Sequence, residues 1–239
     1  MPNPIQIKTK RRTYVREKSA SIARWLREPV PPTLVFSDTH FVPRWSAWSD
    51  DAPEDLLALL EQLSTHRLLS LGDLTESVGL AANERGELFT SERLQPLWSL
   101  LRARDARVLI GNHDVSAAAQ IRAHFNDVTP EYFPGDIRLR HGHERERVMT
   151  EVVRLVGPIA VPIYERAFRR SGRGPERLPN ARVLSAMPHD DAFVFFGHTH
   201  ARGMELKGAH GAWANPGCFL GSAQSFIMVE ETEIALYTG

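Results

Sequence analysis

The stretch "AFVFFGHTH" (residues 192–200) joins a short apolar run to two histidines separated by one threonine. The apolar residues predict a buried strand that ends at Gly197. Side chains at i and i+2 of an extended backbone point the same way, so His198 and His200 could present both imidazoles to one point beyond the strand. Such a pair is also common at solvated strand ends, so its meaning depends on the other strand ends.

Four other predicted strands end in the same types of residue. These strands are expected at residues 33–37, 67–71, 107–110 and 136–140. Over all five ends, the candidate residues are Asp38, His40, Asp73, Glu76, Asn112, His113, Asp114, His141, His143, His198 and His200. In open α/β sheets, ligands collect at the carboxyl ends of the strands. A solvated-loop explanation would have to apply five times, so we interpret these residues as a metal site.

The order of elements predicts an α/β fold. Amphipathic helices are expected at residues 52–63 and 91–104, between the first three strands, with Pro96 as a weak point in the second helix. Alternating strands and helices imply parallel strands with right-handed crossovers. After residue 190 the pattern changes to short strands, at 192–196, 202–207, 211–215, 225–230 and 232–238, and these predict a second, largely antiparallel region.

Composition indicates one large globular domain in a reducing compartment. The 239 residues are 42% hydrophobic and 24% charged, and their formal net charge is zero. The one cysteine, Cys218, allows no intrachain disulfide, which fits a cytoplasmic location. The N-terminus lacks the apolar stretch of a signal peptide, and residues 155–163, the longest apolar segment, are too short to span a bilayer.

The first thirty residues are strongly basic. They hold eight lysines and arginines against two glutamates, a net charge of +6. We expect residues 1–30 to form a solvated, partly mobile arm beside a single domain at residues 31–239. The alternative interpretation is an arm that binds phosphate or a membrane surface.

The ligand types narrow the choice of metal. Carboxylate, amide oxygen and imidazole suit Mn²⁺, Fe and Zn²⁺. The set is too large for one tetrahedral ion, whereas two ions with a shared carboxylate would use all of it. Two metals roughly 3.5–4 Å apart form a clamp for in-line displacement at phosphorus.

The motif order D-x-H, G-D-x-x-E, G-N-H-D, H-G-H and G-H-x-H resembles that of the calcineurin-like metallophosphoesterase superfamily. The resemblance covers roughly residues 33–239. It implies a four-layer α-β-β-α sandwich with two divalent metal ions at the strand ends. It also implies hydrolysis of a phosphate ester by a hydroxide that bridges the two metals. We expect these ions to be Mn²⁺, with Fe or Zn²⁺ as alternatives.

The resemblance also implies roles for individual residues. Asp38, His40 and His200 would bind the first metal, Asn112, His141 and His198 the second, and Asp73 would bridge them. His113 would be the general acid or a phosphate-binding cation.

Two positions depart from or extend the family pattern. Glu76 stands where the family has an aspartate that supports the general acid, and it could serve the same role or be a solvated residue at a helix start. His143 could contact phosphate or lie on the surface.

Residues 144–182 form a long insertion between "HGH" and "GHTH". Its nine arginines and five glutamates give a net charge of +4, and its apolar residues predict one or two helices. We expect a helical cap over the metal cleft, similar in placement to the lipid-binding cap of UDP-2,3-diacylglucosamine hydrolases. The apolar residues could line an acyl groove or pack onto the sandwich. The histidine of "GNHD" departs from those hydrolases, which commonly have arginine there.

The loop after the first motif carries Arg44, Trp45 and Trp48. It could stack a base or sugar, or its tryptophans could pack the loop itself.

The predicted function is hydrolysis of a phosphodiester or pyrophosphate bond in a small or nucleotide-like phosphate ester. Three alternatives stay open: a metal-dependent nuclease that acts on nucleic acid, a UDP-diacylglucosamine-type pyrophosphatase that contacts a membrane peripherally, and a non-catalytic metal-binding scaffold.

Overall fold

A computed structural model provides the fold. It describes residues 5–43, 51–78, 80, 82–129, 132–143, 179–185, 191–208, 211–221 and 224–239.

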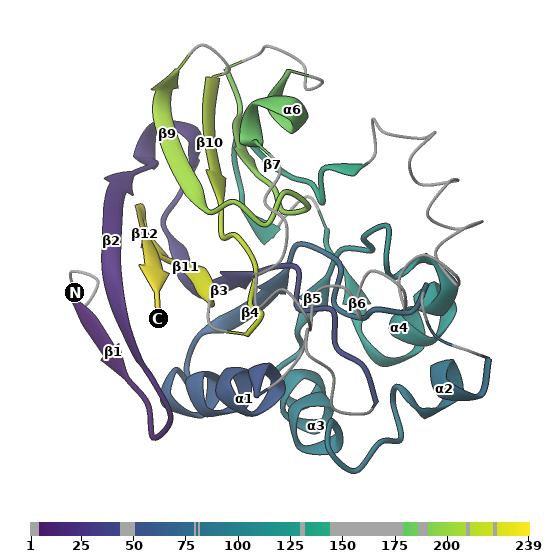
Figure 1. The fold of residues 1–239 in the computed structure, drawn as a ribbon. Helices are drawn as coiled ribbons and strands as arrows, with labels where there is room; N and C mark the ends of the chain where they lie inside the picture. The colour runs from purple at the N-terminus through teal and green to yellow at the C-terminus, as the bar shows by residue number, and fades with distance from the viewer. Residues whose placement is uncertain are drawn as a thin grey trace.

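The larger of two sheets has eight strands (Figure 1). In spatial order they are β1 (Gln6–Lys8), β2 (Thr13–Ser21), β12 (Glu233–Thr238), β11 (Ser225–Glu231), β3 (Val30–Phe36), β4 (Arg67–Ser70), β5 (Arg107–Val108) and β6 (Asn126–Asp127). From β3 to β6 the pairing is parallel, and from β3 through β11 to β1 it is antiparallel. The parallel half therefore brings the ends of β3, β4 and β5 to one edge of the sheet.

Helices make the crossovers between the parallel strands. They are α1 (Ala52–Gln62), α2 (Ala82–Glu87), α3 (Gln95–Ala103) and α4 (Ala118–His124). A short 3₁₀ helix, Val115–Ala117, precedes α4, and another, Ala23–Trp25, lies between β2 and β3. The helix expected at 91–104 begins at Gln95, so Pro96 lies in its first turn, where a missing N–H breaks no helical bond.

The smaller sheet has the order β7 (Ile137–Leu139), β8 (Phe193–Phe195), β10 (Gly211–Asn215) and β9 (Gly203–Gly208). Only β9 is antiparallel to its neighbour, because β8 runs parallel to both β7 and β10. The prediction of a largely antiparallel second region was therefore wrong for this sheet. The last two strands, β11 and β12, are antiparallel but complete the larger sheet.

Three apolar clusters separate four layers. The first packs α1, α3 and α4 on one face of the large sheet and includes Leu59 and Trp98. The second lies between the sheets and includes Val35 and Phe195. The third packs α6 (Asn180–Leu184) on the outer face of the small sheet (Figure 1). The α-β-β-α sandwich is thus confirmed, whereas the expected cap lies outside the described residues apart from 179–182, where α6 begins.

The basic N-terminal segment is part of the large sheet, so the prediction of a solvated arm was wrong. Strand β2 pairs with β12 along most of its length, and Tyr14 is fully buried in the helix-side core. Two of its basic residues form ion pairs, because Arg11 Nε and Arg12 Nε lie 2.7 and 2.6 Å from the carboxylate of the buried Asp55 in α1. One buried side chain in each strand, Ile7 in β1 and Tyr14 in β2, fixes these strands to the core, while most other side chains of β2 stay exposed.

Within the described residues, no helix is long and apolar enough to cross a membrane.

Candidate metal centre

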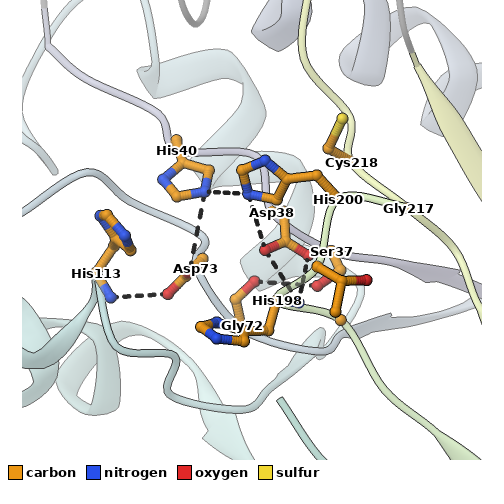
Figure 2. A network of polar contacts seen from close by, with 12 residues as sticks. Ser37, Asp38, His40, Gly72, Asp73, His113, His198, His200, Gly217 and Cys218 are labelled. Atoms are coloured by element: carbon orange, nitrogen blue, oxygen red, sulfur yellow. Dashed lines mark hydrogen bonds and ion pairs between the residues drawn. The ribbon is translucent and has the colours of Figure 1, made fainter. Parts of the chain in front are cut away.

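The predicted ligands come together at one edge of the two sheets. Asp38 and His40 follow β3, Asp73 follows β4, Asn112 follows β5, His141 follows β7, and His198 and His200 follow β8. Figure 2 shows six residues of this region, Asp38, His40, Asp73, His113, His198 and His200, in one network of polar contacts. The buried positions of Asp38, His40, Asp73 and His141, all at most 1% exposed, keep bulk water from their ligand atoms.

Five of these residues have a left-handed backbone. Their φ angles are 52° at Asp38, 44° at His40, 50° at Asp73, 69° at His198 and 55° at His200. Non-glycine residues adopt this conformation rarely, and such strain concentrates at functional sites.

The left-handed turn explains why His198 and His200 do not meet at one point. An extended backbone would have let both imidazoles converge, whereas the family resemblance assigned one to each metal. In the structure β8 ends at Phe195 and both histidines have positive φ. His200 groups with Asp38 and His40, whereas His198 groups with Asp73 and His141. Thr199 therefore separates two imidazoles that serve different groups.

The first group, Asp38, His40 and His200, holds its ligand atoms within 4.8 Å of one another. His40 Nε2 and His200 Nε2 lie 3.2 Å apart, and His200 Nε2 lies 3.4 Å from Asp38 Oδ1. Two imidazole nitrogens and a carboxylate thus face a common centre.

The second group, Asp73, His141 and His198, is equally compact. His141 Nε2 lies 3.1 Å from Asp73 Oδ2 and 3.1 Å from Asn112 Oδ1. Asp73 Oδ2 is also 3.8 Å from His40 Nε2 of the first group. Asp73 is therefore the residue that lies between the two groups, as expected for a bridging carboxylate.

The chemistry of the donors fits metal ions. His141 Nδ1 lies 2.8 Å from the carbonyl oxygen of Leu71, which can only accept, so Nδ1 carries a proton. The other nitrogen, Nε2, then faces one oxygen atom of Asp73 and one of Asn112. These three atoms are all hydrogen-bond acceptors, so a cation is needed to hold them together. A proton or a divalent metal can be that cation, and nitrogen and oxygen ligands without thiolate suit Mn²⁺, Fe and Zn²⁺.

The pKa values of the protein without metal agree with this need for positive charge. Burial alone would lower the pKa of His141, but the charge of Asp73 outweighs burial and raises the pKa to about 10. Burial alone would raise the pKa of Asp73, but His141, His113 and His40 hold it well below the ordinary range. Protons on histidine therefore offset the carboxylate charge wherever metals do not.

Glu76 joins a ligand of the first group to His113. Its Oε2 atom lies 2.9 Å from His40 Nδ1 and 2.7 Å from His113 Nδ1. Burial would raise the pKa of Glu76, but His113 and His40 lower it to about 2. Burial would lower the pKa of His113, but Glu76 and Asp73 raise it to about 9. Glu76 is thus a buried carboxylate rather than a solvated residue at a helix start.

His113 also lies close enough to His40 and Asp73 to form a third potential metal group. Its backbone N–H donates to Asp73 Oδ1 at 2.8 Å, and its side chain is 19% exposed, more than the 7% of Glu76. The imidazole is therefore held on its buried side and open on the other.

Two glycines allow the loops to approach this closely. Gly72 has a φ of 105°, and a Cβ there would lie 2.6 Å from His141 Nδ1. A Cβ at Gly111 would overlap the carboxylate of Asp73. Any side chain at either position would displace a ligand.

Asp114 has a supporting role that the sequence did not reveal. Its buried carboxylate accepts hydrogen bonds from the N–H groups of Leu74, Thr75 and Gly111 at 3.1, 2.8 and 3.1 Å, and from the Thr75 hydroxyl at 2.9 Å. It thereby joins the loops after β4 and β5. The "GNHD" motif contains this residue, but only the fold shows which loop it binds.

The expected substrate contacts are described only in part. The ring of His143 lies 5.2 Å from that of His141 and 6.4 Å from that of His198, measured between centroids, so His143 borders the second group. Arg44, Trp45 and Trp48 lie outside the described residues.

Comparison with known proteins gives one family. Residues 33–233 match the model of the calcineurin-like phosphoesterase superfamily domain. No curated protein sequence matches the chain.

Several solved structures are similar in part. Yfce, a phosphoesterase from E. coli, is 23% identical, with 82% of this chain and 87% of that chain covered and a TM-score of 0.43. A metallophosphoesterase from Sphaerobacter thermophilus is 16% identical, with 87% and 88% covered and a TM-score of 0.39. A single mutant of Vps29 from Entamoeba histolytica is 19% identical, with 87% and 91% covered and a TM-score of 0.33.

Proposed function

The chain belongs to the calcineurin-like phosphoesterase superfamily, and we propose that it hydrolyses a phosphodiester or pyrophosphate bond with the help of two divalent metal ions. The observation that carries this proposal is the pair of compact ligand groups with Asp73 between them. A single structural ion would use one such group, whereas two adjacent groups suit a reaction that must stabilise both the attacking and the leaving oxygen.

The ligand assignment follows the two groups. Asp38, His40 and His200 would hold the first ion, and His141 and His198, with the amide oxygen of Asn112, the second. Asp73 would contribute to both. Bound divalent ions at such a site lower the pKa of water and offset the charge of the phosphate. We propose Mn²⁺ as the physiological ion, with Fe or Zn²⁺ as alternatives, because the proposed ligands are imidazole nitrogens and carboxylate or amide oxygens.

His113 is the proposed general acid. With a pKa of about 9, its imidazole is protonated at neutral pH and can donate a proton to the leaving oxygen. Glu76 holds Nδ1, so the proton to be transferred is the one on Nε2. A general acid needs one ring nitrogen held by a carboxylate and a protonated nitrogen that the substrate can reach, and His113 with Glu76 fits this requirement.

The substrate is proposed at the level of its chemistry, a small or nucleotide-like phosphate ester. Protein stripped with a chelator and reloaded with Mn²⁺, Fe²⁺ or Zn²⁺ is assayed on bis-p-nitrophenyl phosphate, p-nitrophenyl phosphate, a UDP-sugar and single-stranded DNA. We expect hydrolysis of the diester or of the pyrophosphate bond, lost in Asp73→Asn. Tight binding of two ions without hydrolysis of any substrate would indicate a metal-binding scaffold instead, and cleavage of DNA alone would indicate a nuclease.

A further inference from the structure

Thr199 lies between the two histidines that serve different metal groups. It is fully buried, and its hydroxyl donates a hydrogen bond of 2.6 Å to Asn180 Oδ1. Asn180 opens α6, on the outer face of the small sheet. The loop between His198 and His200 is therefore anchored to a helix that contributes no metal ligand.

Asn215, the last residue of β10, completes this anchor. Its side-chain nitrogen lies 2.8 Å from Thr199 Oγ1 and 3.0 Å from Asn180 Oδ1, and its own Oδ1 accepts from the N–H of Gly217 at 2.7 Å. Asn215 is fully buried. Three separate segments of the chain thus share one closed set of hydrogen bonds around Thr199.

The loop needs such an anchor because its backbone is strained on both sides of Thr199. His198 and His200 are both left-handed, a conformation that persists only where the surroundings impose it. The backbone N–H of His198 does bond to the carboxylate of Asp38, at 3.0 and 3.1 Å from its two oxygens, but Asp38 is itself a candidate ligand. The side-chain network restrains the loop without using any of the proposed ligands.

We propose that Thr199, Asn180 and Asn215 are positioning residues that hold His198 and His200 apart, so that each imidazole reaches its own metal group. This inference rests on the proposed metal centre. Ligand-orienting residues of this kind typically change metal affinity by about 10- to 100-fold when they are mutated.

The first loop offers a contrast. Thr39 lies between Asp38 and His40 just as Thr199 lies between the histidines, but its hydroxyl donates to the backbone oxygen of Leu74 at 2.8 Å. Asp38 and His40 belong to one group, so that turn does not have to direct two ligands to two centres. The hydroxyl of Thr199 instead has side-chain partners, so substitution of Asn180 or Asn215 can change the second turn.

Thr199→Val tests the proposal, since it removes the hydroxyl and keeps the shape. Thr199→Ser restores the hydroxyl, and Thr33→Val is the matched control, because Thr33 is also fully buried but bonds only to the carbonyl oxygen of Pro31, within β3. Calorimetric titration of metal-free protein with Mn²⁺ gives both affinities, and the visible spectrum of the Co²⁺-loaded protein reports the coordination geometry.

We expect Thr199→Val to weaken both binding steps by about 10- to 100-fold and to alter the Co²⁺ spectrum, with Thr199→Ser and Thr33→Val close to wild type. If Thr199→Val does not fold, Asn180→Ala removes the same acceptor at a half-buried position. Unchanged affinities, a loss confined to one step, or an equal loss in Thr33→Val would overturn the inference. A wild-type protein that binds no metal would instead overturn the proposed function.

Discussion

Glu76 Oε2 lies 2.7 Å from His113 Nδ1, and the two side chains are only 7% and 19% exposed. The contact leaves only one nitrogen of His113 for chemistry and keeps a negative charge against the imidazole. Because the same oxygen lies 2.9 Å from His40 Nδ1, the carboxylate also fixes the ring of a metal ligand. Glutamate in place of the family's aspartate therefore reaches both histidines.

Removing the charge of Glu76 should change the pH dependence of the reaction. Glu76 raises the pKa of His113, so Glu76→Gln should lower that pKa and move the alkaline limb of the kcat profile to lower pH. Steady-state rates from pH 6 to 10 with a phosphodiester of high leaving-group pKa measure the shift. Glu76→Asp keeps the negative charge, so its alkaline limb should stay closer to the wild-type pH. If the alkaline limb of Glu76→Gln lies at the same pH as that of the wild-type protein, the limb does not report the ionisation of His113.

His113→Ala should lower turnover and leave metal binding largely intact. His113 donates through its backbone to Asp73, a bond that alanine keeps, and it is not among the proposed ligands. General acids contribute roughly 10²–10⁴-fold, and the loss should be smaller for p-nitrophenolate, which needs little protonation to leave. Rates for good and poor leaving groups, with metal content by elemental analysis, test this. Loss of an ion would show that His113 is a ligand, which the close approach of His113 to His40 and Asp73 allows.

Strand-end residues were sufficient to predict which Asp and His side chains lie close together, because parallel strands deliver their carboxyl ends to one edge whatever the details of packing. They did not predict the backbone. The loop that carries His198 and His200 is bonded through Thr199 to Asn180 and Asn215, which are 18 and 15 residues from the nearer histidine and join the loop only in the folded sheet.

The N-terminal strands escaped prediction for a similar reason. Strand β2 pairs with β12, at the other end of the chain, and sequence alone gives weak information about such distant partners. A run of lysine and arginine suggested a solvated segment, whereas the acceptor for Arg11 and Arg12 is one aspartate of α1.

Asp73→Asn should weaken both metal sites, and Asn112→Ala mainly the second. Asp73 lies between the two groups, and its charge would be shared by both ions, whereas Asn112 contacts only His141 among the proposed ligands. Elemental analysis after reconstitution with Mn²⁺ gives the number of ions per chain. One fully retained ion in Asp73→Asn would show that the carboxylate does not bridge.

Metal binding should release protons and strengthen as pH rises. The pKa of His141 is about 10 without metal, so its Nε2 proton must leave when an ion takes its place. Each proton released at pH 6–9 makes binding about tenfold tighter per pH unit. Titrations in buffers of different ionisation enthalpy count the protons, and a pH-independent affinity would contradict a protonated site.

The same histidine makes the stability of the metal-free protein depend on pH. The pKa of His141 is raised above its ordinary 6.5 to about 10, so its stabilising contribution is complete below 6.5 and is lost as pH rises through about 10. Between pH 7 and 10, the unfolding temperature of the metal-free protein should therefore fall further than that of protein loaded with Mn²⁺.

Asp55 should be the residue that fixes the N-terminal strands to the helix layer. It is 2% exposed, it accepts from Arg11 and Arg12, and Gln224 Nε2 donates to it at 2.7 Å. Burial would raise its pKa, but these three partners outweigh burial and lower the pKa, so the stabilisation is present above the unfolded pKa and is lost as pH falls through the lower folded value.

Asp55→Ala should cost about 1.5–3 kcal/mol of unfolding free energy, the range for hydrogen bonds to a charged group, with the partly exposed arginines placing it toward the lower end. Urea unfolding of metal-free protein measures the cost apart from the metal centre. Lys10→Ala is the control, because Lys10 and its partner Glu61 are 68% and 49% exposed and such a pair contributes little. Equal unfolding midpoints for Asp55→Ala and Lys10→Ala would mean that β1 and β2 are held by strand pairing and Tyr14 alone.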